Sequence, residues 1–234
     1  SEVRVIPAPC IGRCEQAPAA VVGQHPVACA SADKIAALAK AKAVRHPPAR
    51  DTGTFEPVAF VEPEHTPGVQ LEVTPAYVGY GAYRAAGGYR LAAECHAGRH
   101  PVDEVIAKME HSGLRGLGGA GFPTGRKWRI VRAEAAPRLV AINIDEGEPG
   151  TFKDRTYLER DPHRFLEGLL IATWAVEAAA CYVYLRDEYH GCRAILEAEL
   201  AKLQADPPFP LPAIELRRGA GAYICGEESA MIES

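Results

Sequence analysis

The chain has 234 residues, of which 47% are hydrophobic and 24% charged, and its formal net charge is −4. This is the composition of an ordinary globular protein with room for one large domain and a smaller unit. The charge balance and the lack of a long basic run in the sequence predict no nucleic-acid partner. No apolar run reaches the roughly 20 residues that cross a bilayer, and the first residues do not resemble a signal peptide.

Seven cysteines, an odd number with irregular spacing, argue against a disulfide framework. They indicate a reducing compartment, and we expect a cytoplasmic protein. Cys10 and Cys14 are separated by three residues, unlike the C-x2-C pairs of zinc ribbons. A pair alone cannot supply four ligands, so we expect neither a metal site nor a 2Fe–2S cluster there.

The first part of the chain reads as a small α/β unit followed by a linker. We predict strands over 3–7 and 19–22 on either side of the cysteine pair, then a helix capped by Ser31 or Asp33. Residues 1–46 form this unit, and the proline-rich stretch 47–73 is an extended linker. Residues 74–111 are a helical segment with predicted helices over 77–86 and 102–111.

From residue 112 onward strands and helices alternate. Apolar strands are predicted over 139–144, 181–185 and 214–216, with one helix opening at Pro162 and another capped by Asp187. This alternation predicts a parallel sheet covered by helices, whose ligands bind beyond the carboxyl ends of the strands. The chain stops inside the opening turns of a helix and starts without Met, so we expect a segment of a longer protein.

The glycine loop, residues 113–125, contains six glycines in thirteen residues. Glycine is retained where the backbone needs positive φ or must be approached closely by another molecule. Arg115, Arg126, Lys127 and Trp128 add charge for phosphate and a ring for stacking. Residues 116–121 match G-x-G-x-x-G, but a helix precedes them and Phe-Pro-Thr-Gly follows, so this is not an ordinary dinucleotide turn. The loop predicts a flat, phosphorylated ligand; a flexible surface loop is the alternative.

Two acidic clusters lie at the predicted carboxyl ends of strands. The acidic turn, residues 145–150, carries Asp145, Glu146 and Glu148, and the C-terminal loop, residues 219–228, ends in Glu227 and Glu228. A solvated turn, a hard-cation site and acceptors for sugar hydroxyls or amides are the three explanations. A cation site usually adds Asn or Asp at alternate positions, which this turn lacks. With the glycine loop on the same rim, ribose or carboxamide recognition is favoured.

Three stretches, 113–125, 146–155 and 219–228, together resemble signatures of the family of NADH-oxidising FMN (51 kDa-type) flavoprotein subunits. This family includes the FMN subunit of respiratory complex I and its relatives in NAD-linked hydrogenases and formate dehydrogenases. The resemblance covers roughly residues 101–234. Residues 10–18 resemble the second cysteine pair of thioredoxin-like 2Fe–2S ferredoxin subunits. Residues 75–89, and Leu117 where most of the family has Arg, resemble the beta (diaphorase) subunit of soluble molybdenum-containing NAD-dependent formate dehydrogenase.

The resemblance implies a Rossmann-like FMN/NAD-binding domain over 112–234, incomplete at its C-terminus, preceded by a thioredoxin-like ferredoxin-type module. Glu148 would act at the nicotinamide end as the catalytic residue, and Phe122 would face the adenine of NAD. The residues implied to line FMN are Gly116, Gly118, Gly119, Lys127, Asn143, Asp145, Tyr223, Gly226 and Glu227. Those implied to face NAD are Ala120, Phe122, Glu148 and Glu228.

The family also implies an electron path. Hydride would pass between NAD(H) and FMN, and single electrons between FMN and Fe–S clusters, with a 4Fe–4S cluster in a C-terminal part outside this sequence. The implied partners are a thioredoxin-like 2Fe–2S subunit and a large molybdopterin Fe–S catalytic subunit. The equivalent subunits of complex I and of bidirectional hydrogenase are alternatives within the family. A non-catalytic electron-transfer scaffold that has lost its flavin is the alternative of a different class.

Overall fold

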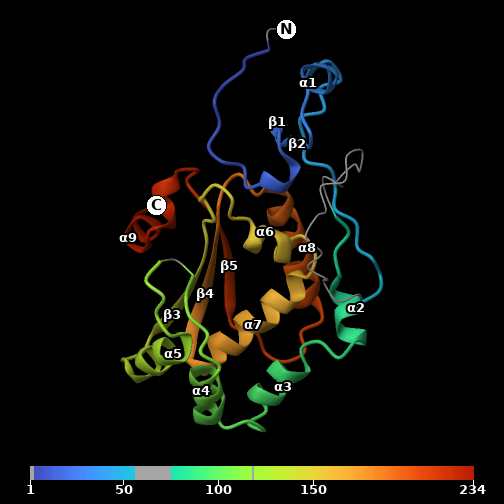
Figure 1. Cartoon of the computed structure of the whole chain (residues 1–234). Helices are drawn as coiled ribbons and strands as arrows, with labels where there is room; N and C mark the ends of the chain where they lie inside the picture. Colours follow the sequence, from blue (N-terminus) through green and yellow to red (C-terminus); the bar gives the residue numbers. More distant parts are fainter. Residues whose placement is uncertain (1–2, 56–74, 118) are drawn as a thin grey trace.

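A computed structural model describes residues 3–55, 75–117 and 119–234 of the chain. Its centre is a three-stranded parallel sheet in the order β3-β4-β5 (Figure 1). The strands are β3 (Arg138–Ile144), β4 (Ala178–Leu185) and β5 (Ala213–Arg218). The predicted α/β class and all three predicted strands of this domain are therefore confirmed.

The connections between the strands are helical, as the sequence predicts. Helices α6 (Lys153–Leu158) and α7 (Pro162–Ala175) join β3 to β4, and α8 (His190–Ala205) joins β4 to β5. Pro162 occupies the first turn of α7, where its missing N–H costs nothing, and the Asp161 carboxylate caps it by accepting from the backbone N–H of Arg164. The core consists of apolar side chains from α7 and α8 packed on one face of the sheet.

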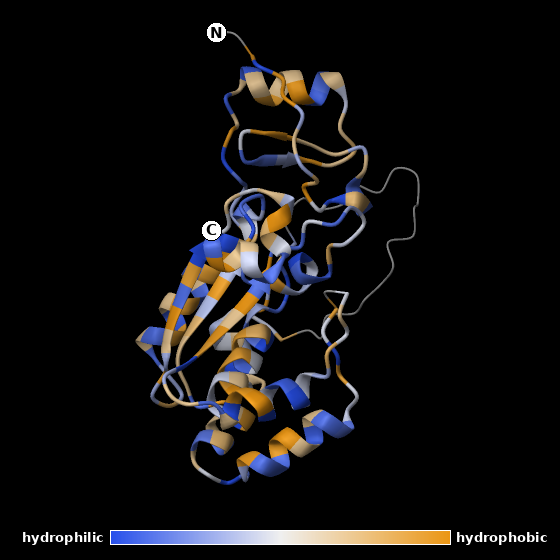
Figure 2. Cartoon of the chain, turned by 90° about the vertical axis from the view of Figure 1, so that its left-hand side faces the viewer, coloured by the Kyte–Doolittle hydropathy of each residue, from blue (hydrophilic) through white to orange (hydrophobic). Residues whose placement is uncertain are grey.

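The other face of the sheet is more open than the sequence predicts. Residues 139–144 read as a strand buried on both faces, but Leu139 is 55% exposed, and Ala141 and Asn143 are exposed as well. Val140 and Ile142 alternate with them and pack on the core. Figure 2 shows hydrophilic residues interspersed among the hydrophobic ones along the strands of the sheet. Helices α7 and α8 pack on the same face of the described sheet, which is therefore the better covered of the two.

Two predicted boundaries are wrong. Asp187 does not cap α8, which begins at His190 after Tyr189; its carboxylate instead accepts hydrogen bonds from the Arg218 guanidinium at 2.5 and 3.1 Å. The predicted helix over 77–86 is shorter, α2 (Tyr80–Ala85), because Tyr77 forms a β-bridge with Asp51. Helices α3 (Arg90–His96), α5 (Thr124–Ala133) and α6 have no counterpart among the predicted elements.

The remaining helices frame the glycine loop and close the chain. The predicted helix over 102–111 is α4 (Val102–His111), and α5 (Thr124–Ala133) follows the loop. The 3-10 turn η2 (Tyr223–Gly226) and helix α9 (Glu228–Glu233) come after β5. In Figure 1 the glycine loop rises beside β3, while α9 lies at the upper end of the same side.

The N-terminal part contains the 3-10 turn η1 (Cys14–Gln16), the antiparallel hairpin β1 (Ala20–Val22) and β2 (His25–Val27), and α1 (Ala32–Lys40). Ser31 caps α1 as predicted, accepting a hydrogen bond from the Lys34 backbone N–H. The strand predicted over 3–7 does not form. Val3, Val5 and Ile6 are 62–89% exposed, so their side chains pack against no apolar surface. The predicted linker, 47–73, lies mostly outside the described residues.

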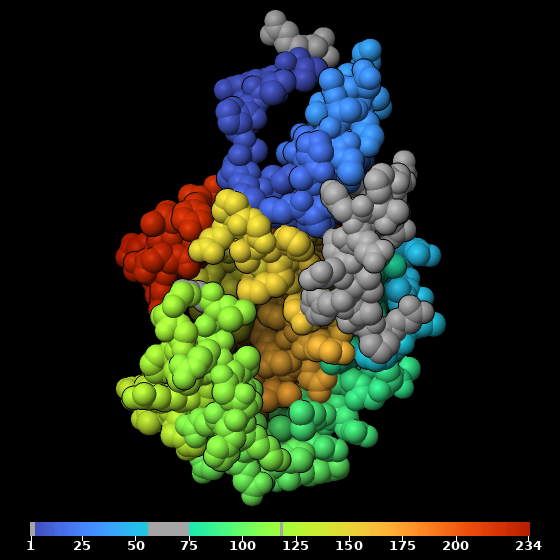
Figure 3. Space-filling view, in the orientation of Figure 1, coloured from blue at the N-terminus to red at the C-terminus, as the bar shows by residue number. Residues whose placement is uncertain are grey.

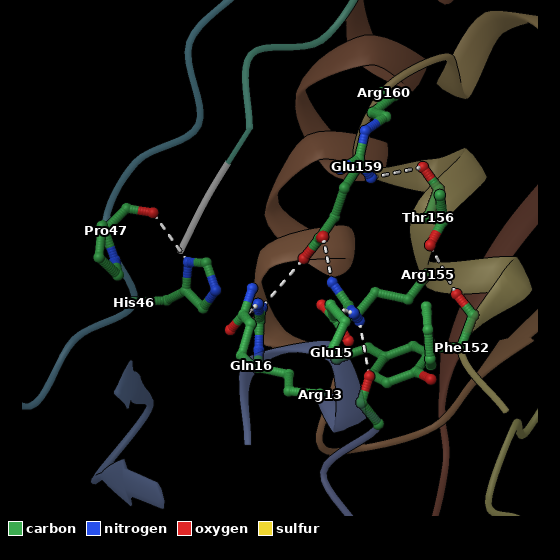
Figure 4. Close-up of polar contacts among 12 residues, drawn as sticks. Arg13, Glu15, Gln16, His46, Pro47, Phe152, Arg155, Thr156, Glu159 and Arg160 are labelled. Carbon is green, nitrogen blue, oxygen red and sulfur yellow. Dashed lines mark hydrogen bonds and ion pairs between the residues drawn. The ribbon is translucent and has the colours of Figure 1, made fainter. Parts of the chain in front are cut away.

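Buried charges fasten this part to the sheet domain (Figure 4). Arg155 of α6 is only 3% exposed; it donates to the Gly12 carbonyl at 2.9 Å, to Glu159 at 2.6 Å and to Glu15. Arg13 donates to the other oxygen of Glu159 at 3.0 Å. Burial lowers the pKa of Arg155, but Glu159 and Glu15 outweigh this effect and raise it. The N-terminal turn, residues 9–16, is therefore held against α6 by paired charges.

Candidate functional site at the carboxyl ends of the strands

The acidic turn and the C-terminal loop meet where β3 and β5 end, as the sequence predicts for a single rim. The Asn143 amide donates to the Gly226 carbonyl at 2.8 Å, and its oxygen accepts from the backbone N–H of Asp145 at 3.0 Å. A side chain at Gly226 would lie 3.1 Å from the Asp145 carbonyl oxygen, so the two loops approach more closely there than a Cβ readily allows. Asn143 therefore joins the two loops.

Asp145 has an unsatisfied carboxylate oxygen. Its Oδ2 is buried and accepts no hydrogen bond from any described residue. Desolvation raises the pKa of Asp145, although the positive charge of Arg186 opposes the rise. A buried acceptor without a donor is costly, and a ligand carrying hydroxyl or N–H groups would relieve that cost.

Glu148 and Tyr223 lie at the outer edge of this rim. The Tyr223 hydroxyl is 3.5 Å from Glu148 Oε1, and Tyr223 is 65% exposed. Tyr223 also covers Gly147, at which a Cβ would meet its ring at 3.1 Å. An exposed aromatic ring beside an exposed carboxylate is suited to contact a planar group that carries donors.

Two of the other three carboxylates of the clusters have structural partners. Glu227 caps α9: its Oε2 accepts from the backbone N–H groups of Ser229 and Ala230, and the Ser229 hydroxyl bond leads the hydrogen bonds that lower the pKa of Glu227. Glu146 turns inward, accepting from the Asp154 and Arg155 backbone N–H groups and from the Tyr189 hydroxyl. Glu228 is exposed in the first turn of α9.

The glycine loop closes on itself. The Gly116 N–H donates to the Phe122 carbonyl at 3.0 Å, and Arg115 forms a β-bridge with Pro123. The Arg115 guanidinium donates to the Gly121 carbonyl at 2.9 Å, so at least one of its N–H groups braces the loop rather than awaiting a phosphate. The loop runs from α4 into α5, which confirms that it is not a strand-to-helix dinucleotide turn.

The tip of the glycine loop is open to solvent. Gly119 and Gly121 have φ of +92° and +59°, conformations that favour glycine, and a Cβ at either would meet no atom within 4 Å. Ala120 and Lys127 are exposed, and Phe122 is 38% exposed with the Arg126 guanidinium 5.8 Å from its ring centroid. Gly118 lies outside the described residues. In Figure 3 this loop, the acidic turn and α9 gather on the same side of the molecule.

Sequence reasoning missed two contributors to the rim. Arg186 follows the last residue of β4 and is 3% exposed, and the N-terminal residues Pro9 and Cys10 line a hollow together with the acidic turn. The position of Arg186 at the carboxyl end of a predicted strand was the available signal. Nothing in the sequence placed residues 9 and 10 there. Within the described residues, no three His, Cys, Asp or Glu side chains gather as a metal site would require.

A parallel sheet with long loops at its carboxyl end is the arrangement of α/β domains that bind ligands at that edge. Residues 109–234 match the model of the Nuo51 FMN-binding domain. That match spans more than half of the sequence, so the chain belongs to this family of flavoprotein subunits, as the sequence resemblance predicts.

Individual relatives agree. The chain is 44% identical over 161 residues to an NADH-quinone oxidoreductase subunit of Rhizobium meliloti, and the match covers 65% of this chain and 38% of that protein. It is 43% identical over 145 residues to the mitochondrial NADH-ubiquinone oxidoreductase 51 kDa subunit of Neurospora crassa, which covers 56% of this chain and 29% of the relative.

Among solved structures, an NAD+-reducing [NiFe]-hydrogenase in the air-oxidized state is 33% identical, with a TM-score of 0.66. The match covers 96% of this chain and 37% of the hydrogenase chain. The chain thus spans only about a third of the length of these proteins. No helix in the described residues has the length and apolar character needed to cross a membrane.

Proposed function

We propose that this chain is the FMN-binding part of a diaphorase subunit that exchanges a hydride between NAD(H) and FMN and passes single electrons to or from Fe–S clusters. The observation that carries the proposal is the joined rim: Asn143 links the acidic turn to Gly226, and Asp145 Oδ2 is buried there without a donor. A flavin with its ribityl chain offers hydroxyl and N–H donors for such an oxygen. Family membership independently supports FMN as the ligand.

The residues fit the flavin in chemistry. Asn143, Asp145 and Gly226 would hold it at the strand ends, and Tyr223 offers an exposed ring beside them. Glu227 would support it by fixing the start of α9 through Oε2. We assign the remaining flavin contacts to the open backbone of the glycine loop and the charge beyond it: Gly116, Gly118, Gly119 and Lys127.

For NAD(H) we assign the more exposed side chains. Phe122 would stack on the adenine, with Ala120 and Glu228 nearby, and Glu148 would accept hydrogen bonds at the nicotinamide end. When bound, the flavin supplies the conversion between two-electron hydride transfer and one-electron transfer. This chain's own contribution is to orient the nicotinamide and to exclude competing reactions.

Formate dehydrogenase is the complex in which we place the subunit. The sequence of residues 75–89 and Leu117 in the glycine loop support this choice. The partners would then be a thioredoxin-like 2Fe–2S subunit and a molybdopterin Fe–S subunit, with a 4Fe–4S cluster elsewhere in the protein. All seven cysteines are unpaired, which supports a cytoplasmic location.

An NAD-reducing hydrogenase is the second candidate, because the likeness to that structure extends over 96% of the chain and thus includes residues before 109. Complex I is the third, supported by the NADH-quinone and NADH-ubiquinone oxidoreductase relatives. Metal analysis of the co-purifying large subunit separates them. Molybdenum supports formate dehydrogenase and nickel supports hydrogenase. A large subunit that contains neither molybdenum nor nickel contradicts both of these assignments.

The test of the core proposal uses purified protein supplied with FMN. We expect flavin absorbance and NADH–dye reductase activity; if both are missing, the proposal is wrong. Glu148→Gln should lower the rate of NADH oxidation at least tenfold while leaving the flavin bound, since it removes a charged acceptor. Glu134→Gln, an exposed position at the end of α5, is the control. An unchanged rate in the Glu148 variant would instead favour the non-catalytic scaffold or a different NAD contact.

A further inference from the structure

Arg186 lies beneath the rim and belongs to none of the three family signatures. It directly follows β4, and its backbone N–H donates to the Ile144 carbonyl at 3.1 Å, which extends the pairing of the strand ends. Its side chain is 3% exposed, and its guanidinium lies 5.0 Å from the centroid of the Tyr189 ring. A buried arginine requires partners for its donors, and these partners reveal its role.

The guanidinium joins two segments that are far apart in the sequence. Nη1 donates to the Glu146 carbonyl in the acidic turn, and Nη2 donates to the Cys10 carbonyl at 2.5 Å. Nε donates to Glu188 Oε2 at 3.1 Å. Arg186 therefore bridges the backbone of the acidic turn and that of the N-terminal turn, while Glu188 balances its charge.

A second contact joins the same two segments. The Gly150 N–H, at the end of the acidic turn, donates to Cys14 Sγ at 3.1 Å. Between the segments lies a hollow of about 220 Å³. Its walls come from the N-terminal turn, the acidic turn, the residues after β4 and the C-terminal loop, and include Pro9, Cys10, Asp145, Arg186, Glu188 and Tyr223.

We propose that Arg186 is a positioning residue that fixes the N-terminal turn as one wall of the ligand site and holds the acidic turn in place for Asp145 and Glu148. This inference rests on the proposed function, because it concerns the same rim. Through this anchoring by Arg186, the N-terminal part takes a role in ligand binding, in addition to any role in electron transfer. Arg186 touches neither ligand in this scheme; it acts through two carbonyl groups.

The test compares Arg186→Lys and Arg186→Gln with the wild-type protein. A lysine ammonium carries all three of its donors on one nitrogen, so it cannot reproduce the planar fork that bridges both carbonyls. Arg217→Gln is the matched control, since Arg217 is 59% exposed on β5 and pairs with Glu215. Two readouts are used: the rate at which iodoacetamide alkylates half-buried Cys10, followed by mass spectrometry, and the separate KM and kcat for NADH in the FMN-loaded protein.

Losing one charge-assisted hydrogen bond corresponds to about a tenfold effect. We expect Arg186→Lys to raise the Cys10 alkylation rate and the KM for NADH about tenfold, with kcat within about twofold of wild type, because the turn is displaced while the reacting groups remain. Arg186→Gln should show a larger effect. A residue that merely stabilised the fold would change the melting temperature without this split between KM and kcat.

An unchanged Cys10 alkylation rate and an unchanged KM in Arg186→Lys overturn the inference, whether or not Arg186→Gln folds. A fall in kcat alone also overturns it, since it would place Arg186 in the chemistry. If wild-type protein binds no FMN and oxidises no NADH, the proposed function fails. The Cys10 alkylation rate then still decides whether Arg186 holds the N-terminal turn. An unchanged rate in Arg186→Lys would show that it does not, and the inference would fail as well.

Discussion

Asp145→Asn tests the reasoning about the rim most directly, because stability and ligand binding should change in opposite directions. In the ligand-free protein, Asp145 Oδ2 is buried without a donor, and desolvation raises the pKa of the carboxyl above its usual 3.8. The ionised form is thus disfavoured in the folded state. The stability of the fold should decline as the pH rises from about 3.8 through the raised pKa.

The expected magnitude follows from the unsatisfied oxygen. A buried acceptor without a partner costs about 1–3 kcal/mol. Replacing the charged carboxylate by a neutral amide should recover part of this, so we expect Asp145→Asn to stabilise the ligand-free protein by about 1 kcal/mol at neutral pH. In the FMN-bound state the same change removes a charged acceptor, and FMN affinity should fall about tenfold or more.

Two measurements check this. Urea unfolding of the ligand-free protein at several pH values gives the stability and its pH slope, and FMN fluorescence titration gives the affinity. Asp103→Asn is the control: Asp103 is 82% exposed on α4, so both quantities should stay near their wild-type values. A variant that is less stable without FMN, or that binds FMN as tightly as wild type, would refute the reasoning about Asp145.

Two further predictions concern the buried charges. Glu199, which is fully buried, is desolvated, but hydrogen bonds from His163, Lys202 and Tyr77 outweigh this and lower its pKa to about 2. Ionised Glu199 should contribute about 3 kcal/mol to the free energy of unfolding above its usual pKa, and this contribution should be lost as the pH falls toward 2. Acid unfolding of the wild-type protein should show the loss, and Glu199→Gln should not. Arg155→Gln should cost about 3–5 kcal/mol in urea unfolding, because it removes the cation from half-buried Glu15 and leaves buried Glu159 with Arg13 alone. A wild-type midpoint for the Arg155 variant would contradict the view that paired charges fasten the N-terminal turn.

Much of the architecture is determined locally, and the sequence could therefore predict it. The apolar runs of β3, β4 and β5 and the helical periodicity between them predict a parallel sheet, since such alternation has few other packed solutions. Ser31 at the start of α1 and Pro162 at the start of α7 are correctly placed because capping is a short-range effect. The same holds for the meeting of the acidic turn and the C-terminal loop, because parallel strands end on one rim.

Tertiary structure alone decided which of the acidic side chains stay at the rim and which turn inward. Asp145, Glu146 and Glu148 are equivalent in sequence, yet Glu146 turns inward to Tyr189 and α6 whereas Glu148 stays exposed. Asp187 looks like a helix cap but pairs with Arg218 at the end of β5, and α8 begins only at His190. Long-range contacts bring the N-terminal turn to the rim: Arg155 and Arg186 donate to carbonyl groups of the turn that lie more than 130 residues away in the sequence. Local pattern fixes which elements form, whereas long-range pairing of buried charges fixes which of them share the site.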